Sequence, residues 1–557
     1  MANIIKKWAT TMMLISLGGS LLAGCSGNSN AGQQGNGAAG GNGEARSSIT
    51  STIYDRGSVP NGMGTIEDNM WTKWINDNGP ANVKFVAIPR WESQSKLNVL
   101  FASGSAPDLI FEFGTSIRNQ FFDQKQLLPL DDLIEQHSVE YKALMEKYPQ
   151  LKQAGTKTDG KLYEVGRINE VYPLVSLFIR EDWLEKLNLE APTTEEEMIA
   201  VAKAFTEQDP DGNGVADTYG LSGLKFGDSS GLYKFMYNAN WVNLEENGEI
   251  AVGLNNMKEA TAFKRNLYEA GVVDKDFLTD KDGSKAKQDF LNGKIGMYAF
   301  MTADYTSFAS RELDTLMKNV PEAKLKVIPL PKTSVGQFNP VWNNPVQMTA
   351  VVNARAKDPE AVMKHIDFLT KVETGRTFKN GIEGVHYQLE ADGKPVITDL
   401  DKFKNEVSWA SDYDLIYTRL EEGKYGYAET QFDESIPYQK EALRLFRESM
   451  ATYMNDLPVG EGLTHSEHMP QLPKELQVKF SNVTSAIDDI FTRAIISGSN
   501  YPLEQANAEA IKQWETGGGP EIESWYKEWW GKEKDNVLVW SDFYEIYEQQ
   551  QVAFKSE

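Results

Sequence analysis

Cysteine is almost absent from this chain, since Cys25 is the only one among 557 residues. One cysteine cannot form an intramolecular disulfide, so stability has to come from burial of apolar side chains. The length makes such burial feasible, because it exceeds one ordinary hydrophobic core and predicts two or more domains. A cysteine nucleophile is also excluded if Cys25 serves another purpose.

Basic stretches and long apolar runs are lacking as well. Acidic side chains outnumber basic ones by 80 to 56, and the formal net charge is −24. An acidic body repels nucleic acid and anionic membrane surfaces, and no basic run opposes this, so nucleic-acid binding is excluded. Beyond the N-terminus no apolar stretch approaches the roughly 18 residues that mark a candidate transmembrane helix.

The N-terminus has the features of an export signal. Lys6 and Lys7 precede an apolar run over residues 12–23. A transmembrane anchor is the alternative interpretation, but spanning a bilayer takes about 20 apolar residues. A basic start, a short apolar region and small residues before the cleavage point are typical of secretory signals. Residues 1–24 are therefore predicted to be a signal peptide.

Leu-Ala-Gly-Cys at residues 22–25 resembles a bacterial lipobox, in which the cysteine is acylated and becomes the mature N-terminus. Lipid attachment at Cys25, of palmitate type, would anchor the chain on the extracellular face of the cell membrane, since each buried CH₂ contributes about 0.8 kcal/mol. Residues 25–46 are mostly Gly, Asn, Gln, Ser and Ala and are predicted to be a flexible tether. About 20 such residues reach roughly 25 Å.

The body that follows alternates between strand and helix patterns. The first set comprises an expected strand at 49–54, a helix at 67–76, a strand at 83–88, an amphipathic helix at 93–103 and a buried strand at 106–111. This β-α-β-α-β order predicts a mostly parallel sheet with helices on both faces. A second set includes strands at 174–179, 295–298 and 348–353 and helices that start at Thr194, Asn255 and Pro359. Beyond residue 400 the pattern is mainly helical, with a break at Gly517-Gly518-Gly519.

Four segments carry a resemblance to a known family. They are Ser-Ala-Pro-Asp-Leu at 105–109, Arg-Glu-Asp-Trp-Leu at 180–184 followed by Ala-Pro-Thr-Thr at 191–194, Gly-Lys-Ile-Gly-Met-Tyr at 293–298, and Asn353-Ala354 before the helix at 359–370. In this order, behind a lipobox, the chain resembles the extracellular solute-binding proteins of bacterial ABC importers, in the large family-1 type with a lipoprotein anchor.

The resemblance implies an α/β fold of the type II periplasmic-binding-protein kind, with two lobes joined by a hinge. Lobe one would take residues 47–170 and 332–400, and lobe two would take 171–331 and 401–500. Residues 501–557 would form a C-terminal helical segment. The ligand would lie in the cleft and hold the lobes closed, and the protein partners would be the permease subunits in the membrane.

The ligand-site candidates follow from the placement of ligands at the carboxyl ends of parallel strands. Sugar rings stack on aromatic side chains, and their hydroxyls pair with Asp, Glu, Asn and Arg. The candidates are Asp55, Arg56, Glu112, Phe113, Thr115, Asp304, Tyr305, Trp342, Asn343 and Asn344, together with Tyr233 and Trp241, which fall where similar proteins have lobe-two contacts. Plain packing is the alternative for every aromatic residue, and it is the preferred interpretation for Trp91, Trp183, Trp525, Trp529 and Trp530.

Residues 209–217, Asp-Pro-Asp-Gly-Asn-Gly-Val-Ala-Asp, have the spacing of a calcium loop. The expected ligands are Asp209, Asp211, Asn213, the carbonyl of Val215, and Asp217. Glycine at the sixth position permits the sharp turn that wraps such a loop around one hard cation. Position 12 is Gly220 instead of a bidentate Glu, so the loop is not a complete EF-hand, and an ordinary turn is the alternative. Similar solute-binding proteins have calcium loops of this kind, so we expect structural calcium here.

Catalysis is the main rival to binding. A secreted glycoside hydrolase needs two carboxylates that flank the scissile bond, but none of the 80 acids lies in a distinctive motif. Neither G-x-S-x-G nor H-E-x-x-H is present, and His465-Ser466-Glu467-His468 fits a solvated loop better than a metal site. We therefore expect no catalytic residues and no enzyme activity.

The sequence favours a lipid-anchored extracellular protein that captures a carbohydrate, most readily an oligosaccharide, and delivers it to an ABC importer as a monomer. A peptide or another polar solute is the alternative ligand. A secreted glycan-active enzyme or a cell-surface adhesion protein is the alternative class.

Overall fold

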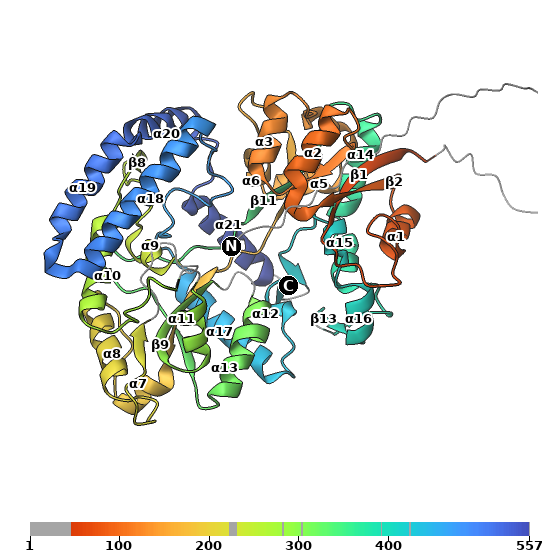
Figure 1. The fold of residues 1–557 in the computed structure, drawn as a ribbon. Helices are drawn as coiled ribbons and strands as arrows, with labels where there is room; N and C mark the ends of the chain where they lie inside the picture. Colours follow the sequence, from red (N-terminus) through yellow and green to blue (C-terminus); the bar gives the residue numbers. More distant parts are fainter. Residues whose placement is uncertain are drawn as a thin grey trace, which may run out of the picture. The chain divides into compact units, whose positions relative to one another are not determined.

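The computed structural model describes residues 46–221, 231–280, 283–301, 305–391, 393–422 and 425–555 (Figure 1). The predicted signal peptide, Cys25, the tether and Asp304 lie outside these residues. Within them, no helix has both the length and the hydropathy that crossing a bilayer requires.

A five-stranded sheet forms in the N-terminal part of the body, with β11 returning from later in the chain. Its order is β2 (Asn82–Pro89), β1 (Ser48–Asp55), β3 (Leu109–Phe111), β11 (Val346–Val352) and β4 (Glu164–Ile168). β1 runs parallel to β2 and β3, whereas β11 is antiparallel to β3 and β4. The parallel arrangement of the first three strands is thus as predicted, and the returning strand makes the sheet mixed.

Helices cover this sheet. Those before β4 are α1 (Met70–Asn78), the 3₁₀ turn η1 (Arg90–Glu92), α2 (Ser93–Ala102), α3 (Thr115–Asp123), α4 (Asp131–His137), α5 (Glu140–Lys147) and α6 (Gln150–Gly155). After β11 come α14 (Pro359–Thr370), α15 (Val372–Asn380), the hairpin β12 (Tyr387–Leu389) and β13 (Pro395–Ile397), α16 (Leu400–Glu406) and η3 (Ala410–Tyr413). The side chain of Asn69 caps α1 by accepting from the backbone N–H groups of Trp71 and Thr72.

A four-stranded sheet forms from the middle of the chain. Its order is β10 (Leu325–Ile328), β5 (Val175–Arg180), β9 (Ile295–Met301) and β6 (Tyr219–Leu221). All six residues of β5 are buried, including the polar Ser176 and Arg180 among its apolar side chains. The helices around this sheet include α7 (Glu181–Leu187), α8 (Glu195–Glu207), α9 (Leu232–Tyr237), α10 (Met257–Glu269), α11 (Ser284–Leu291), α12 (Tyr305–Phe308), η2 (Ala309–Leu313) and α13 (Asp314–Asn319).

The remainder of the chain is mainly helical, as predicted. It contains the short pairs β7 (Val242–Leu244) with β8 (Ile250–Val252) and β14 (Glu421–Glu422) with β15 (Tyr425–Gly426), and the turns η4 (Glu429–Gln431) and η5 (Gly498–Asn500). The long helices are α17 (Pro437–Tyr453), α18 (Lys474–Ser497), α19 (Leu503–Thr516), α20 (Gly519–Glu533) and α21 (Trp540–Lys555). Gly518, with φ of +104°, makes the turn between α19 and α20 at the predicted glycine break.

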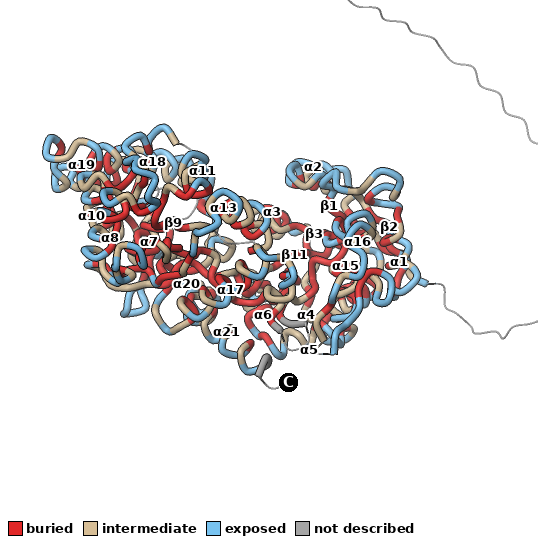
Figure 2. Tube along the Cα trace, turned by 90° about the horizontal axis from the view of Figure 1, so that it is seen from below, coloured by how far each residue is buried: buried red, intermediate tan, exposed pale blue. Residues whose placement is uncertain are grey.

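The buried side chains form two cores, one around each sheet, and we call the elements around them the first and second lobes. Figure 2 shows this buried chain in red beneath exposed helical turns such as those of α19. Residues 407–416, which the sequence interpretation placed in lobe two, contribute Val407, Tyr413 and Ile416 to the first core. Helices α19 to α21 contribute to the second core, so the described part of the predicted C-terminal segment, residues 501–555, belongs with the second lobe.

Three stretches of chain cross between the lobes side by side. Asn169 N–H donates to Pro345 O, Glu170 N–H to Arg419 O, and Asn343 N–H to Tyr172 O, at 2.8–2.9 Å. Helix α21 packs on this junction, where the buried side chain of Gln550 accepts from Val171 N–H and donates to Asn169 O, both at 3.0 Å. The two-lobe α/β architecture with several crossings is therefore confirmed.

Candidate ligand-binding cleft

Two adjoining cavities lie between the first lobe and the segment and helices that follow residue 465. The larger, of about 1110 Å³, is lined by α3 and α6 on one side and by the start of α18 and the second half of α20 on the other. The smaller, of about 610 Å³, is lined by η1, the start of α2 and residues 112–117. Gln94, Thr115 and Glu467 line both. We call the two cavities together the cleft; a space of this size suits an extended ligand.

The carboxyl ends of β2 and β3 supply one wall of the smaller cavity. Because β1, β2 and β3 are parallel, Arg90 and Phe113 come together beside Tyr54. The guanidinium carbon of Arg90 lies 4.8 Å from the ring centroid of Tyr54 and 5.4 Å from that of Phe113, and these two rings stack at 5.7 Å. Cation–π contacts thus hold Arg90 in place.

Aromatic rings line both ends of the cleft. Trp91, at the smaller cavity, is 85% exposed, and Arg90 lies 5.2 Å from the centroid of its ring. Trp525 and Trp529 line the larger cavity from α20 and are half-buried, whereas Tyr526 and Trp530 on the same helix point into the core. Flat apolar surfaces are therefore available to a ligand at two separate places.

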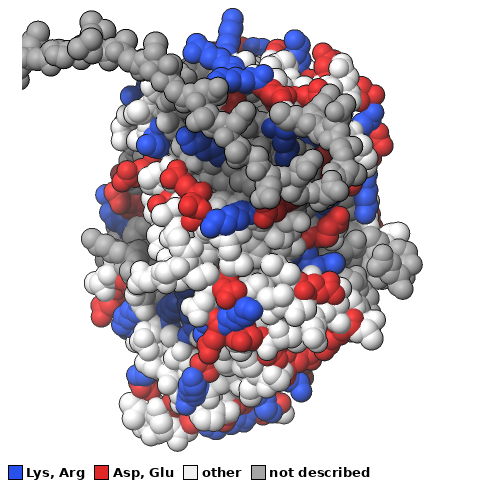
Figure 3. Space-filling view, turned by 90° about the vertical axis from the view of Figure 1, so that its right-hand side faces the viewer, with Lys and Arg blue, Asp and Glu red and all other residues white. Residues whose placement is uncertain are grey.

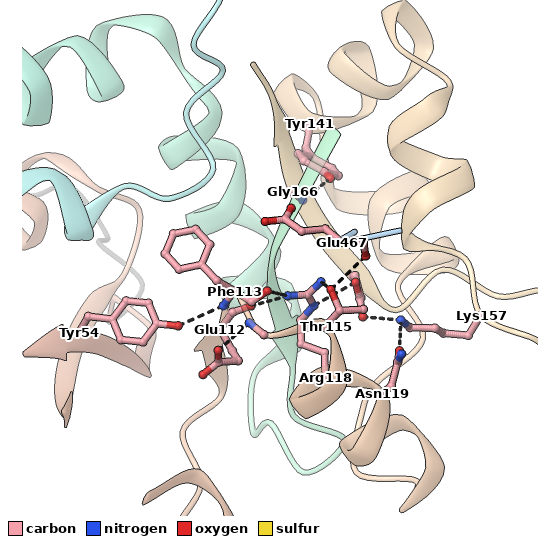
Figure 4. A network of polar contacts seen from close by, with 12 residues as sticks. Tyr54, Glu112, Phe113, Thr115, Arg118, Asn119, Tyr141, Lys157, Gly166 and Glu467 are labelled. Atoms are coloured by element: carbon pink, nitrogen blue, oxygen red, sulfur yellow. Dashed lines mark hydrogen bonds and ion pairs between the residues drawn. The ribbon is translucent and has the colours of Figure 1, made fainter. Parts of the chain in front are cut away.

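Arg118 holds the loop that forms the floor of the smaller cavity (Figure 4). Its guanidinium donates to the carbonyls of Glu112 and Phe113 at 2.7 Å and pairs with Glu164 at 3.0 Å. Lys157 also pairs with Glu164. Burial alone would raise the pKa of Glu164, but the charges of Arg118 and Lys157 outweigh it and hold this pKa below the ordinary value.

The segment from His465 to His468 connects the two sides of the cleft. The hydroxyl of Thr115 donates to the carbonyl of Glu467 at 3.2 Å, and Asn344 donates to the Glu467 carboxylate at 2.6 Å. Nε2 of His468 is 2.8 Å from Oδ1 of Asn344. Glu467 is thereby fixed at the boundary that the two cavities share.

Of the residues expected at the site, Glu112, Phe113 and Thr115 are brought together at the smaller cavity. Glu112 is 1% exposed; its Oε1 accepts from Gly114 N–H at 2.7 Å, and its Oε2 is buried with no hydrogen-bond partner among the described residues. Asn344 lines neither cavity, but its side chain is hydrogen-bonded to Glu467 and His468, which do line them.

The other candidates that fall within the described residues lie away from the cleft lining. Asp55 accepts from Gly57 N–H in its own turn, and Arg56 pairs with Asp412. Tyr233, Tyr305 and Trp342 are 1%, 4% and 1% exposed in the second core, and Trp241 stacks on Trp514 at 5.4 Å. Asn343 lies in a crossing, where its amide donates to Glu170 O. These side chains support packing or the interlobe junction.

Sequence reasoning did not name Arg90 or Glu467 as ligand candidates, and it preferred packing for Trp91, Trp525 and Trp529, which line the two cavities. The sequence analysis looked for ligand-binding residues just past the carboxyl ends of the first and third strands. The same search past the end of β2 would have found Arg90 and Trp91, because they directly follow it. Ile522, Tyr526 and Trp530 recur at helical spacing, which leaves Trp525 and Trp529 on the neighbouring face. Nothing in the sequence places Glu467 opposite Thr115.

The loop over residues 209–217 brings two of the predicted carboxylates, those of Asp211 and Asp217, close to each other. The amide nitrogen of Asn213 lies 2.7 Å from Oδ2 of Asp211 and 3.2 Å from Oδ1 of Asp217, so these two carboxylates approach one point. Burial, the hydrogen bond to Asp209 and the charge of Asp217 raise the pKa of Asp211. Asp217 also pairs with Lys294 at 2.8 Å. The donor set fits a hard cation, although no three acidic, His or Cys side chains in the described ranges are arranged as a ready metal centre.

Of the two histidines in the 465–468 segment, His468 lines the larger cavity. Burial, together with the charges of His465 and Arg118, lowers the pKa of His468 to about 3, so its ring is neutral at physiological pH. With Nε2 hydrogen-bonded to Asn344, the ring supports the position of Glu467.

Comparison with known proteins shows the family to which the chain belongs. Residues 73–381, more than half of the chain, match the family described as bacterial extracellular solute-binding protein. The lipoprotein LipO of Bacillus subtilis is 24% identical over 93% of this chain and 96% of its own length. The fructooligosaccharide ABC transporter substrate-binding protein FusA of Streptococcus pneumoniae is 31% identical over 40% of this chain and 44% of its own.

Solved structures share the fold. An extracellular solute-binding protein from Bifidobacterium longum subsp. infantis aligns with a TM-score of 0.65 at 16% identity, over 87% of this chain and 98% of that one. FusA in complex with kestose aligns with a TM-score of 0.59 at 18% identity, over 88% and 100%, and FusA has also been solved as an EF-hand mutant. The chain thus belongs to the family of bacterial extracellular solute-binding proteins.

Proposed function

We propose that this protein captures an oligosaccharide in the cleft and delivers it, unchanged, to an ABC importer. The observation that carries the proposal is an extended space between two lobes, with aromatic rings lining both ends and polar side chains between them. FusA, a relative, is described as binding fructooligosaccharide. Rings of an oligosaccharide have apolar faces for Trp91, Trp525 and Trp529, and hydroxyls for Gln94, Glu112 and Glu467.

Capture would proceed by closure of the lobes around the ligand. Trp91 and Glu112 belong to the first lobe, whereas Trp525 belongs to the second, so a ligand that touches all three favours the closed arrangement over the open one. The crossings beside Asn169 and Arg419 would act as the hinge. Arg118 and Asn344 would keep the binding groups in position without touching the ligand.

Membrane attachment would come from an acylated Cys25 and the 25–46 tether. LipO, which is similar over nearly its whole length, is described as a lipoprotein. An anchored receptor with a tether of roughly 25 Å stays within reach of a permease in the same membrane. Metabolic labelling with a palmitate analogue tests this, since Cys25→Ser should abolish the label.

Trp91→Ala is expected to weaken oligosaccharide binding at least 30-fold and to leave thermal stability unchanged. Anchor tryptophans typically contribute about 2 kcal/mol or more to binding, and 2 kcal/mol corresponds to about 30-fold in Kd. The side chain is 85% exposed, so its loss leaves no cavity. Calorimetric titration measures the affinity, with Trp91→Phe as a control that keeps a flat ring. Equal affinity in Trp91→Ala and wild type would remove Trp91 from the site.

We also propose that residues 209–217 hold a structural calcium ion. Asp209, Asp211, Asn213, the Val215 carbonyl and Asp217 would be its ligands, and the ion would supply charge to a loop whose carboxylates repel one another. Calcium at 100 times its Kd should raise the free energy of unfolding by about 2.7 kcal/mol relative to chelated protein. Thermal melts with EDTA and then with calcium measure this, and Asp211→Asn should blunt the response. Identical melts in both conditions would contradict the proposal.

A further inference from the structure

Acidic side chains outnumber basic ones in the lining of the smaller cavity. Its lining contains the acidic side chains Glu92, Glu112 and Glu467 and one basic side chain, Arg90. On the face shown in Figure 3, acidic and basic side chains are interspersed. The ligand charge that the cleft accepts depends on the side chains that line it.

Glu112 and Glu467 are fixed in the wall and cannot swing away from a ligand. Glu112 is 1% exposed and is held by Gly114 N–H, while its buried Oε2 lacks a partner among the residues described. Glu467 is held through its carbonyl by Thr115 and through its carboxylate by Asn344. Both acids are acceptors without a proton to donate when ionised, so they match hydroxyl donors.

Arg90 does not make the smaller cavity favourable for an anion. Its guanidinium lies over the rings of Tyr54, Trp91 and Phe113, whose faces stabilise its charge where it is. Because no acidic side chain of the described chain pairs with it, Arg90 is the one group in this cavity that could attract an anion. Three acidic side chains, those of Glu92, Glu112 and Glu467, line the same cavity and oppose the binding of an anion there.

The basic groups of the larger cavity are mostly engaged. Arg118 and Lys157 both pair with Glu164, and Lys532 pairs with Glu528 at 2.7 Å. Lys474 remains, but the lining also includes Asp123 and Glu533. This cavity therefore offers an anion no excess of positive charge.

We propose that the cleft selects uncharged oligosaccharides and rejects those that carry carboxylates, and that Glu467 is a specificity-determining residue. This inference rests on the proposed function, since it presupposes that the cleft binds sugar. Glu467 lies where the two cavities meet, so every ligand that occupies both has to pass its carboxylate. A like charge placed opposite it is repelled, which is how binding sites commonly exclude an unwanted partner.

The test uses a matched pair of ligands. A panel of uncharged and uronate oligosaccharides is first titrated against the full chain, and the tightest uncharged binder is then compared with its derivative in which the primary hydroxyls have been oxidised to carboxylates. We expect the derivative to bind at least 30-fold more weakly to wild type. Glu467→Gln should reduce the ratio of the two dissociation constants, oxidised over uncharged ligand, about 10-fold. Glu185→Gln, at an exposed site, should leave this ratio unchanged.

Salt gives a second readout that does not depend on the folding of a variant. If repulsion causes the rejection, added salt should tighten binding of the oxidised ligand to wild type, and less so to Glu467→Gln. Equal or tighter binding of the oxidised ligand, or of any uronate in the panel, overturns the inference. Failure of every oligosaccharide to bind, charged or uncharged, overturns the proposed function instead.

Discussion

Replacing Glu164 with glutamine is expected to lower the free energy of unfolding by about 3–5 kcal/mol. The side chains of Glu164 and Arg118 are 1% and 3% exposed, and Lys157 is nearly buried beside them. Removal of one partner from a buried ion pair is strongly destabilising, because it leaves the other charge buried without compensation. Urea unfolding followed by tryptophan fluorescence measures the change.

The matched control is Glu185→Gln. Glu185 pairs with Lys324 at 2.9 Å, but both side chains are 58% exposed. Exposed pairs contribute about 0.2–1 kcal/mol, so this variant should unfold close to wild type. Equal unfolding midpoints for the Glu164 and Glu185 variants would contradict a stabilising role for the buried network.

The same network predicts a direction for the pH dependence. The pKa of Glu164 is lower in the folded than in the unfolded state, so its contribution to stability is fully present above the unfolded value of about 4.3 and is lost as the pH falls through the folded value. The stability gap between wild type and Glu164→Gln should therefore be complete at pH 7 and shrink in acid below about pH 4. A gap that widens in acid would have the wrong sign.

Trp342→Ala is the second variant with a large expected effect, a loss of about 3–5 kcal/mol of stability. The residue is 1% exposed and packs against Tyr544 and Trp540 of α21, at centroid distances of 6.0 and 6.5 Å. Truncation of a buried tryptophan removes apolar contacts and leaves a cavity. Thermal or urea unfolding measures the loss.

Trp342→Phe separates packing from hydrogen bonding at this position. Nε1 of Trp342 is buried without a hydrogen-bond partner among the described residues, so phenylalanine removes no such bond and should cost much less than alanine. Trp91→Ala should behave in the opposite way to Trp342→Ala, because it is expected to weaken ligand binding and to leave stability unchanged. If Trp342→Ala kept wild-type stability and lost only ligand affinity, Trp342 would belong to the site after all.

Sequence patterns predicted helices and strands well where the pattern depends on residues close together in the chain. Three glutamates after Thr194 predicted the start of α8, and the Thr194 hydroxyl does accept from Glu197 N–H. The mostly apolar segment 174–179 predicted a strand, and β5 forms there at Val175–Arg180. Such signals depend on neighbours within a turn or a strand, which the sequence gives directly.

The site residues depended on contacts between distant parts of the chain, and these could not be predicted. Arg56 was a sound candidate at a strand end, but Asp412 pairs with it across 356 positions. Trp342 followed the presumed hinge return, but α21, about 200 residues later, covers it. Glu467 gained its place only through Thr115 and Asn344. In each case the partner lies in another element, and sequence spacing contains no information about it.

The most direct test of the central claim is a titration of the purified chain with a glycan panel, followed by mass analysis of the recovered ligand. We expect saturable binding of an uncharged oligosaccharide, loss of most of that affinity in Trp91→Ala, and recovery of the oligosaccharide with its length unchanged. Cleaved product at saturating protein, or affinity that Trp91→Ala leaves intact, would contradict capture in this cleft.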